Sequence, residues 1–138
     1  MIAVDTGFLY ALLDKADAWH QRAAAAAPTA QEGWITTWPV LTEAAHLMAS
    51  RLGARFAQAL VAEVAAGGLL VWDIPPDRVA HIPKLMRQYA RLPMDLADAS
   101  LVLLAEHLGH GRILTTDRRD FGAYRWKNRK PFHNVLAA

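Results

Sequence analysis

The chain has 138 residues, of which 54% are hydrophobic and 20% are charged, with a formal net charge of +2 and no cysteine. These values suit one globular domain with a full core over residues 1–138, leave no room for a second domain, and exclude disulfides, thiolate metal sites and cysteine nucleophiles. Because Asp5 falls too early for a signal peptide and Glu63 interrupts the longest apolar stretch, we expect a soluble cytoplasmic protein with no membrane span.

The first part of the chain predicts two strands, each followed by helical segments. Residues 2–4 form a short apolar run, and apolar residues at helical spacing follow it. An alanine-rich helix is predicted over 18–27, where Pro28 stops it. A strand over 33–37 then leads into a helix that has Pro39 in its first turn.

The remainder of the chain continues this alternation. The apolar run 69–72 predicts a strand buried on both faces. Helices are predicted over 76–91 and 96–108, and a strand over 112–116. Short apolar strands alternating with helices indicate an α/β fold whose central parallel sheet is flanked by helices on both faces. The tail from about residue 125 has little periodicity, and we expect it to be partly ordered.

Four acidic residues occupy positions that such a fold brings together: Asp5, Glu43, Asp98 and Asp117. Asp5 and Asp117 each follow a predicted strand, and ligands of open α/β sheets bind at the carboxyl ends of the strands. Either residue also suits the N-cap of the following helix, so a capping role stays open for both.

The other two acids lie on predicted helical faces that are largely apolar. Glu43 has apolar residues one turn away on either side, so we expect it to be partly buried. Asp98 leads a similar apolar series. Asp95 lies one turn before Asp98, and it is predicted either to cap that helix in a box-like pair with Asp98 or to be a fifth acid of the cluster.

A converging set of carboxylates predicts a bound cation, because buried carboxylates repel one another and lose hydration. Mg²⁺ or Mn²⁺ fits, since hard divalent ions take carboxylate and water oxygens. Such an ion lowers the pKa of a bound water for attack on phosphorus and neutralises charge on phosphoryl oxygens. Thr6 and Thr116 adjoin two of the acids, and their hydroxyls are predicted either to orient a carboxylate or water or to serve as local cap residues.

Four sequence blocks carry these acids in a fixed order: Ile-Ala-Val-Asp5-Thr-Gly, Val-Leu-Thr-Glu43-Ala, Asp98-Ala-Ser-Leu and Ile-Leu-Thr-Thr-Asp117-Arg-Arg-Asp-Phe121. No block is specific alone, but their order and intervals together are fairly specific. With these blocks the chain resembles the PIN-domain ribonucleases, in particular the VapC-type toxins of bacterial toxin–antitoxin pairs, over nearly its whole length. The resemblance implies a PIN-like domain.

The resemblance also implies a Mg²⁺- or Mn²⁺-dependent endonuclease that hydrolyses RNA phosphodiester bonds and inhibits translation. The implied catalytic acids are Asp5, Glu43, Asp98 and Asp117, and the implied metal ligands among them are Asp5, Asp98 and Asp117. The apolar helix that follows Asp98 matches the family's pattern, which favours Asp98 over Asp95 as the third acid. A homodimer and a cognate antitoxin whose C-terminal segment covers the active site are implied as partners.

Basic residues crowd the C-terminal quarter of the chain and offer a surface for a polyanion. The predicted RNA contacts are Arg118, Arg119, Arg125, Lys127 and Arg129, and a solvated tail is the alternative. Aromatic residues stack on bases in many single-strand binders, and the candidates here are Trp38, Tyr124 and Trp126.

Two non-hydrolytic alternatives remain open. One is a degenerate PIN-like module that binds RNA or a partner without cleaving, against which stands the presence of all four acids. The other is a metal-binding phospho-receiver domain. Such domains have paired acids after the first strand and a lysine after a late strand. This chain instead has Gly7 and Arg118 at those places.

Overall fold

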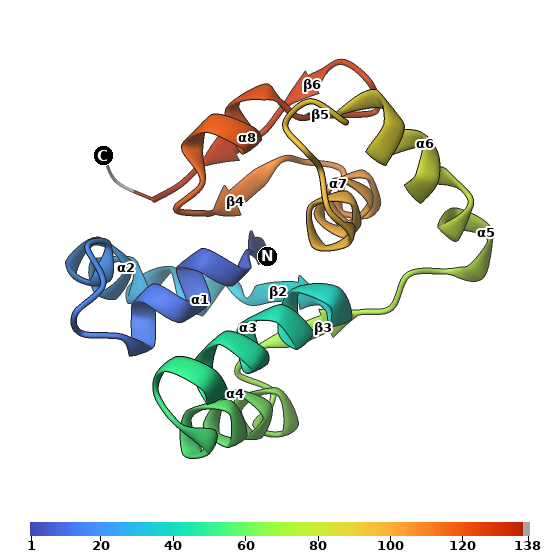
Figure 1. Cartoon of the computed structure of the whole chain (residues 1–138). Helices are drawn as coiled ribbons and strands as arrows, with labels where there is room; N and C mark the ends of the chain where they lie inside the picture. The colour runs from blue at the N-terminus through green and yellow to red at the C-terminus, as the bar shows by residue number, and fades with distance from the viewer. Residues whose placement is uncertain (137–138) are drawn as a thin grey trace.

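A five-stranded parallel sheet forms the centre of the computed structural model, which describes residues 1–136 (Figure 1). In spatial order its strands are β3 (Leu70–Trp72), β2 (Trp34–Thr37), β1 (Ile2–Val4), β4 (Arg112–Leu114) and β7 (His133–Asn134). Every neighbouring pair in this sheet is parallel. The predicted α/β class with a central parallel sheet is therefore confirmed.

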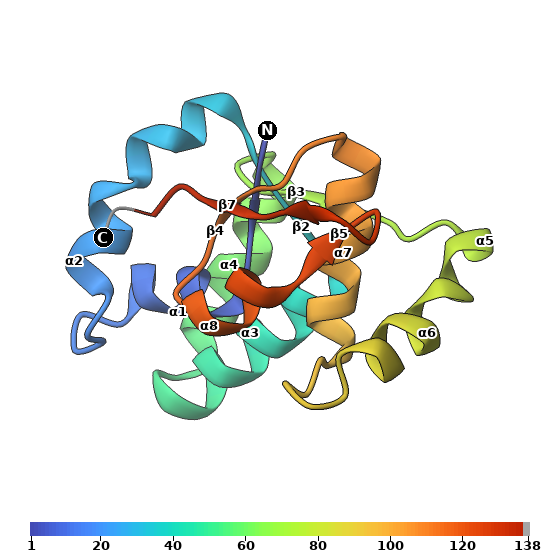
Figure 2. The ribbon, with the colours of Figure 1, turned by 90° about the horizontal axis from the view of Figure 1, so that it is seen from above.

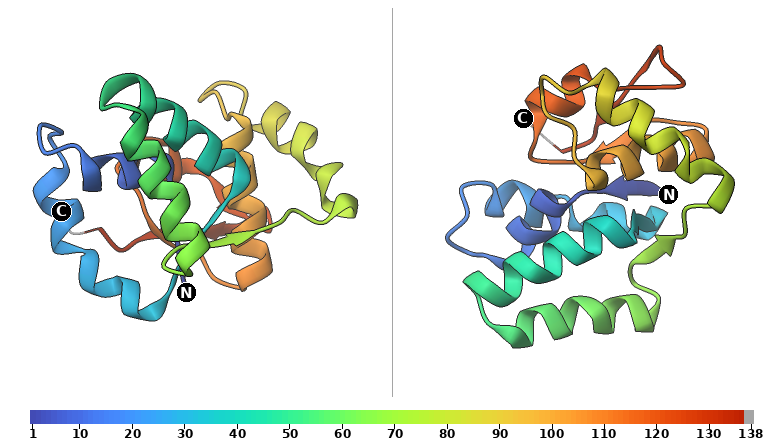
Figure 3. Two further views of the ribbon diagram at one scale, coloured as in Figure 1. Left: turned by 90° about the horizontal axis from the view of Figure 1, so that it is seen from below. Right: turned by 45° about the vertical axis from the view of Figure 1, so that its right-hand side comes forward.

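Helices cover both faces of the sheet, because parallel neighbours need crossover connections. One face carries α1 (Thr6–Leu13), α3 (Trp38–Arg51) and α4 (Ala54–Ala66), and the other carries α7 (Leu96–Leu108) with α6 (His81–Gln88) outside it (Figures 1 and 3). The shorter helical segments are α2 (His20–Ala25), η1 (Ala27–Glu32), α5 (Pro76–Val79) and α8 (Arg118–Ala123). No helix among residues 1–136 is both long and apolar enough to cross a membrane.

The core is one continuous apolar cluster between the sheet and the helices. Ile2 and Val4 of β1, Ile113 of β4, and Leu103 of α7 have no solvent exposure. The helix α7 lies against β1 and β2 and buries most of its residues, which explains its nearly uniform apolar sequence. The predicted bounds of this helix, 96–108, agree with the structure.

The segment after residue 124 is built from very short strands. An antiparallel pair, β5 (Arg125–Trp126) and β6 (Lys130–Pro131), lies next to α7. The chain then runs beside β4 as β7 (Figure 2). Strands of two residues leave no readable periodicity in a sequence.

Two elements predicted after residue 68 differ from the structure. The run 69–72 was expected to be buried on both faces, but β3 is an edge strand and Leu70 is 42% exposed. The helix expected over 76–91 is divided into α5 and α6. In a continuous helix Pro83 would clash with the carbonyl of Val79, whereas a new start at His81 places Pro83 in a first turn, where its missing N–H is harmless.

The alanine-rich segment also differs from its prediction. The helix α2 ends at Ala25, and η1 continues through Pro28. Pro28 therefore lies inside a helical segment instead of stopping one. It is tolerated there because it occupies the first turn of η1, where its backbone nitrogen needs no partner.

Gly111 joins the C-terminal hairpin to the core, and we predict that Gly111→Ala destabilises the protein. A Cβ at Gly111 would lie 2.6 Å from Trp126 Nε1, 2.8 Å from the Pro131 carbonyl oxygen and 3.1 Å from Phe132 Cα. Two of these are backbone atoms, so the hairpin must shift. The expected loss is about 1–3 kcal/mol of unfolding free energy, measured by urea unfolding.

The matched control for this prediction is Gly122→Ala, because a Cβ at Gly122 of α8 meets no heavy atom within 4 Å. This variant should unfold like the unmodified protein or be slightly more stable, since alanine favours the helix. Equal unfolding midpoints for the two variants would contradict the tight contact at Gly111.

Candidate active site

The acids predicted from the sequence line one hollow of about 440 Å³. Asp5, Glu43, Asp98 and Asp117 are all in its lining, together with Thr6, Thr116 and Asp95. The hollow lies at the carboxyl ends of β1 and β4, where the chain passes into α1 and α8. The structure therefore brings together every acid and hydroxyl that the sequence singled out for this site.

Asp5 is buried, with 7% exposure, and both of its oxygens accept hydrogen bonds. Oδ1 accepts from the backbone N–H of Phe8 at 2.9 Å, as the N-cap of α1, and Oδ2 accepts from the Thr115 hydroxyl. Burial nevertheless raises the pKa of Asp5 from 3.8 to about 6, and the charges of Asp117 and Glu43 add to the rise. The capping role and a place in the acidic hollow therefore coexist in this residue.

Asp117 repeats this arrangement at the end of β4. Its Oδ1 accepts from the backbone N–H of Asp120 at 3.0 Å, as the N-cap of α8. Its own backbone N–H donates to Thr115 Oγ1 at 2.9 Å. Burial raises the pKa of the Asp117 carboxyl above its usual value.

Thr115, which the sequence analysis missed, connects Asp5 to Asp117. It is fully buried, and its hydroxyl bonds to both residues. The side chain of Asn134 in β7 clamps its backbone, accepting from Thr115 N at 3.3 Å and donating to Thr115 O at 3.0 Å. The sequence offers two adjacent threonines before Asp117 and no signal that tells which one turns toward Asp5.

Thr6 and Thr116 have different surroundings from Thr115. The Thr6 hydroxyl donates to the Val40 carbonyl at 3.5 Å, a long contact that ties α1 to α3. Thr116 lies against Gly7, where an added Cβ would be only 2.3 Å from Thr116 Oγ1. The glycine after Asp5-Thr6 thus leaves room for the Thr116 side chain at the hollow.

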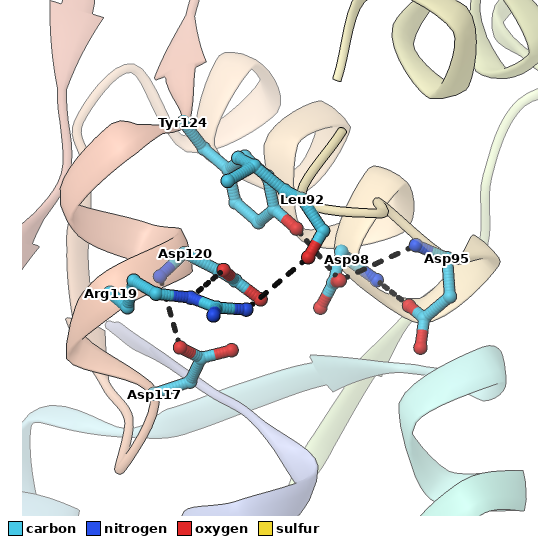
Figure 4. A network of polar contacts seen from close by, with 7 residues as sticks. All are labelled: Leu92, Asp95, Asp98, Asp117, Arg119, Asp120 and Tyr124. Carbon is cyan, nitrogen blue, oxygen red and sulfur yellow. Dashed lines mark hydrogen bonds and ion pairs between the residues drawn. The ribbon is translucent and has the colours of Figure 1, made fainter. Parts of the chain in front are cut away.

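Asp98 and Asp95 form a capping box at the start of α7 (Figure 4). Asp98 N donates to Asp95 Oδ1 at 2.8 Å, and Asp95 N donates to Asp98 Oδ2 at 3.4 Å. The buried Tyr124 hydroxyl donates to Asp98 Oδ2 at 2.9 Å. Burial and then the charge of Asp95 raise the pKa of Asp98 to about 7. Both predicted alternatives for Asp95 are thus present, since it caps the helix and also lines the hollow.

The expected burial of Glu43 is wrong. The residue lines the hollow, but its side chain is exposed, whereas Val40 and Ala44 on the same helix are buried. The apolar neighbours of Glu43 face the core, and Glu43 itself lies on the margin of that face, where α3 borders the opening. A residue of a largely apolar helix can therefore still be exposed to solvent.

Asp120 is a further acid of the hollow that the sequence analysis did not select. It is 8% exposed and pairs with Arg119, whose Nε donates to Asp120 Oδ1 at 3.0 Å. Arg119 also donates to the Leu92 carbonyl at 3.3 Å, so it bridges α8 to the segment before α7 (Figure 4). The signal was present, because Asp120 lies three residues after Asp117 and therefore on the same helical face.

The five predicted RNA-contacting residues do not gather at this hollow. Arg119 lines it, but the Arg118 guanidinium lies over the Trp19 ring at 4.9 Å, and Arg125 donates to carbonyls at the end of α8. Lys127 and Arg129 are exposed at the turn of the β5–β6 hairpin. Four of the five predicted basic contacts therefore lie outside the lining of the hollow.

The side chains of the hollow suit a hard divalent cation. Its possible metal-ligating side chains with a charge are carboxylates, and burial raises the pKa values of Asp5, Asp98 and Asp117. Nearby positive charge reverses such a rise. In the part of the chain that the structure describes, no three acidic or histidine side chains are grouped closely enough to hold a metal ion. Mg²⁺ needs no such cage, because it keeps several waters and takes one or two carboxylates directly.

Comparisons with known proteins assign the chain to a family. The family model of the PIN domain matches residues 2–127. Ribonuclease VapC26 of Mycobacterium tuberculosis (strain ATCC 25618 / H37Rv) is 27% identical over 122 residues, which cover 88% of this chain and 90% of that protein. The crystal structure of Mycobacterium tuberculosis VapC20, described as a Sarcin-Ricin loop cleaving toxin, has the same fold, with a TM-score of 0.79 and 23% identity. It covers 86% of this chain and 92% of that one.

The raised pKa of Asp5 predicts that the metal-free protein loses stability as the pH rises. The Asp5 carboxyl binds its proton more tightly in the folded state than in the unfolded chain. The resulting stabilisation of the folded state is complete below pH 4 and is lost as the pH rises past 6. The change from 3.8 to about 6 corresponds to a contribution on the order of 3 kcal/mol. Asp5→Asn should flatten this dependence, because asparagine caps α1 without ionising.

Thermal unfolding in EDTA between pH 4.5 and 7.5 measures the effect. At pH 7.5 the variant should melt at the same temperature as the unmodified protein or above it, and saturating Mg²⁺ should stabilise it less. Parallel pH profiles for the two proteins would contradict the prediction.

Proposed function

The chain belongs to the PIN-domain family, and from this premise we propose that it is a divalent-metal-dependent ribonuclease of the VapC type, the toxin of a toxin–antitoxin pair that inhibits translation. The observation that carries the proposal is the convergence of Asp5, Glu43, Asp98 and Asp117 on one hollow. Three of these carboxyls have raised pKa values, as expected of a site that binds positive charge.

Asp5, Asp98 and Asp117 are the proposed ligands of Mg²⁺ or Mn²⁺, some of them through water. When bound, the ion activates a water for attack on phosphorus and offsets charge on the phosphoryl oxygens. Glu43, on the exposed wall, is the proposed acceptor of a water proton. Its exposure lets a substrate reach it without opening the fold.

The surrounding hydroxyls fix the proposed ligands in place. Thr115 holds Asp5, and Tyr124 holds Asp98. Burial and the charge of Asp98 raise the pKa of Tyr124, so its hydroxyl remains a donor at neutral pH. Arg119 is the one predicted basic contact in the hollow's lining, and its planar set of five N–H donors suits a phosphate.

The proposed setting follows from the VapC type. The substrate is RNA, a cognate antitoxin covers the site, the protein is a homodimer, and it acts in the cytoplasm. The contrasting function, a PIN-like module that binds RNA or a partner without cleaving it, predicts binding that does not depend on a divalent ion.

The first test of this function is metal-dependent cleavage. The purified chain, incubated with a pool of structured RNAs, should cleave in Mg²⁺ or Mn²⁺ and stop in EDTA, because the carboxylates alone do not activate water. Cleavage is read on a denaturing gel, and resupplied metal should restore it. Undiminished cleavage in EDTA would refute the metal mechanism.

The second test separates Asp98 from Asp95. Asp98→Asn should lower kcat at least about 100-fold, equivalent to roughly 2.7 kcal/mol of transition-state stabilisation. Asp95→Asn should cost less than about threefold, because asparagine caps helices as well as aspartate does. Each variant needs a melting curve. Equally large losses in two folded variants would make Asp95 a full member of the site.

A further inference from the structure

A second hollow, which opens beside the acidic one, has an aromatic residue in its wall. Its volume is about 580 Å³, and its lining includes Trp38, Pro39, His46 and Leu96. The two hollows share three lining residues: Glu43, Asp95 and Ala97. A ligand that extends past the acids between α3 and α7 therefore enters the second hollow directly.

The indole of Trp38 is exposed but held in position. It is 52% exposed, and its Nε1–H donates to Asp73 Oδ1 at 2.7 Å. Trp38 and Asp73 directly follow Thr37 and Trp72, which are paired across β2 and β3. Parallel pairing thus brings the two residues together at the carboxyl edge of the sheet, and one hydrogen bond limits the orientation of the ring.

The other two aromatic candidates from the sequence are not accessible. Tyr124 has no exposure, and its hydroxyl is bonded to Asp98. Trp126 is 5% exposed, and its Nε1–H donates to the Pro131 carbonyl at 3.0 Å. Of the three aromatic residues, Trp38 is the one whose ring remains available to a ligand.

We propose, resting on the ribonuclease function above, that Trp38 is the stacking platform for an RNA base adjacent to the phosphodiester held at the acidic hollow. The base lies flat on the indole, and Leu96, which is 49% exposed, supplies an apolar edge. Stacking tolerates any base because every base has a π face, so this subsite positions the strand instead of reading its sequence.

The substrate class follows from this geometry. A base that lies on Trp38 has left its own stack, which is easy in single-stranded loops and ends and costly in a duplex. The acids and the platform together therefore favour RNA that is unpaired at the cleavage position.

The test compares Trp38→Ala and Trp38→Phe with the unmodified protein. Trp38 is exposed, and its side chain is not part of the core cluster. Both variants should therefore fold. Binding of a single-stranded RNA oligonucleotide is measured by fluorescence anisotropy in EDTA, and cleavage of the same RNA is measured in Mg²⁺. Val61→Ala, an exposed apolar position on α4, is the matched control.

Trp38→Ala should weaken RNA binding and raise KM by roughly 5- to 150-fold, the range for loss of one base–aromatic stack. Trp38→Phe should recover most of the loss, kcat should change little, and Val61→Ala should have no effect. A series of RNAs with one abasic nucleotide at successive positions adds a second readout. One abasic position should weaken binding to the unmodified protein and have no further effect on Trp38→Ala.

Unchanged RNA binding and KM in Trp38→Ala would overturn the proposal, even if Mg²⁺-dependent cleavage is intact. A change of oligomeric state in that variant, seen by light scattering, with RNA binding unchanged, would overturn it in favour of a protein interface. Failure of the ribonuclease function appears separately, as absence of metal-dependent cleavage by the unmodified protein. In that case the binding measurements in EDTA still decide the role of Trp38.

Discussion

The structure depends on holding several carboxylates close together at the carboxyl ends of parallel strands. Three of them lie at helix starts, where backbone N–H groups and the positive end of the helix dipole stabilise negative charge. Asp5 and Asp117 cap α1 and α8, and Asp98 completes the box at α7. These contacts are insufficient to cancel burial, since the pKa values remain raised. The fold thus fixes the acids in place and makes their charged forms costly without a nearby positive charge.

The sequence predicted the parts of this site that follow from strand and helix periodicity. A short apolar run that ends in Asp5 or Asp117 places an acid at the edge of a parallel sheet, and a long apolar series places Asp98 at the start of α7. The alternation of apolar strands with helices likewise predicted the central parallel sheet. Such patterns report which elements form and which residues lie at their ends.

The sequence did not predict features that depend on which elements become neighbours. The position of β3 at the edge of the sheet exposes Leu70, although its run is as apolar as a central strand. Thr115 became a link because β7 lies beside β4, and Glu43 became exposed because α3 borders an opening. Of the five predicted basic contacts, Arg119 alone lines the hollow, because Arg118 lies over the Trp19 ring and Arg125 donates to carbonyls at the end of α8. Each outcome is set by contacts between distant segments.

The clamp from Asn134 to Thr115 also bears on when the site can form during protein synthesis. Thr115 bonds to Asp5, and Asn134 of β7 fixes the backbone of Thr115. The orientation of Asp5 therefore depends on a strand that is synthesised almost 130 residues later. Contacts between such distant segments form slowly, because a long loop must close first. A nascent chain that stops short of β7 would carry all four acids without their final alignment. For the nuclease proposed above, the aligned site would then form only after β7 has been synthesised, and incomplete chains would lack it.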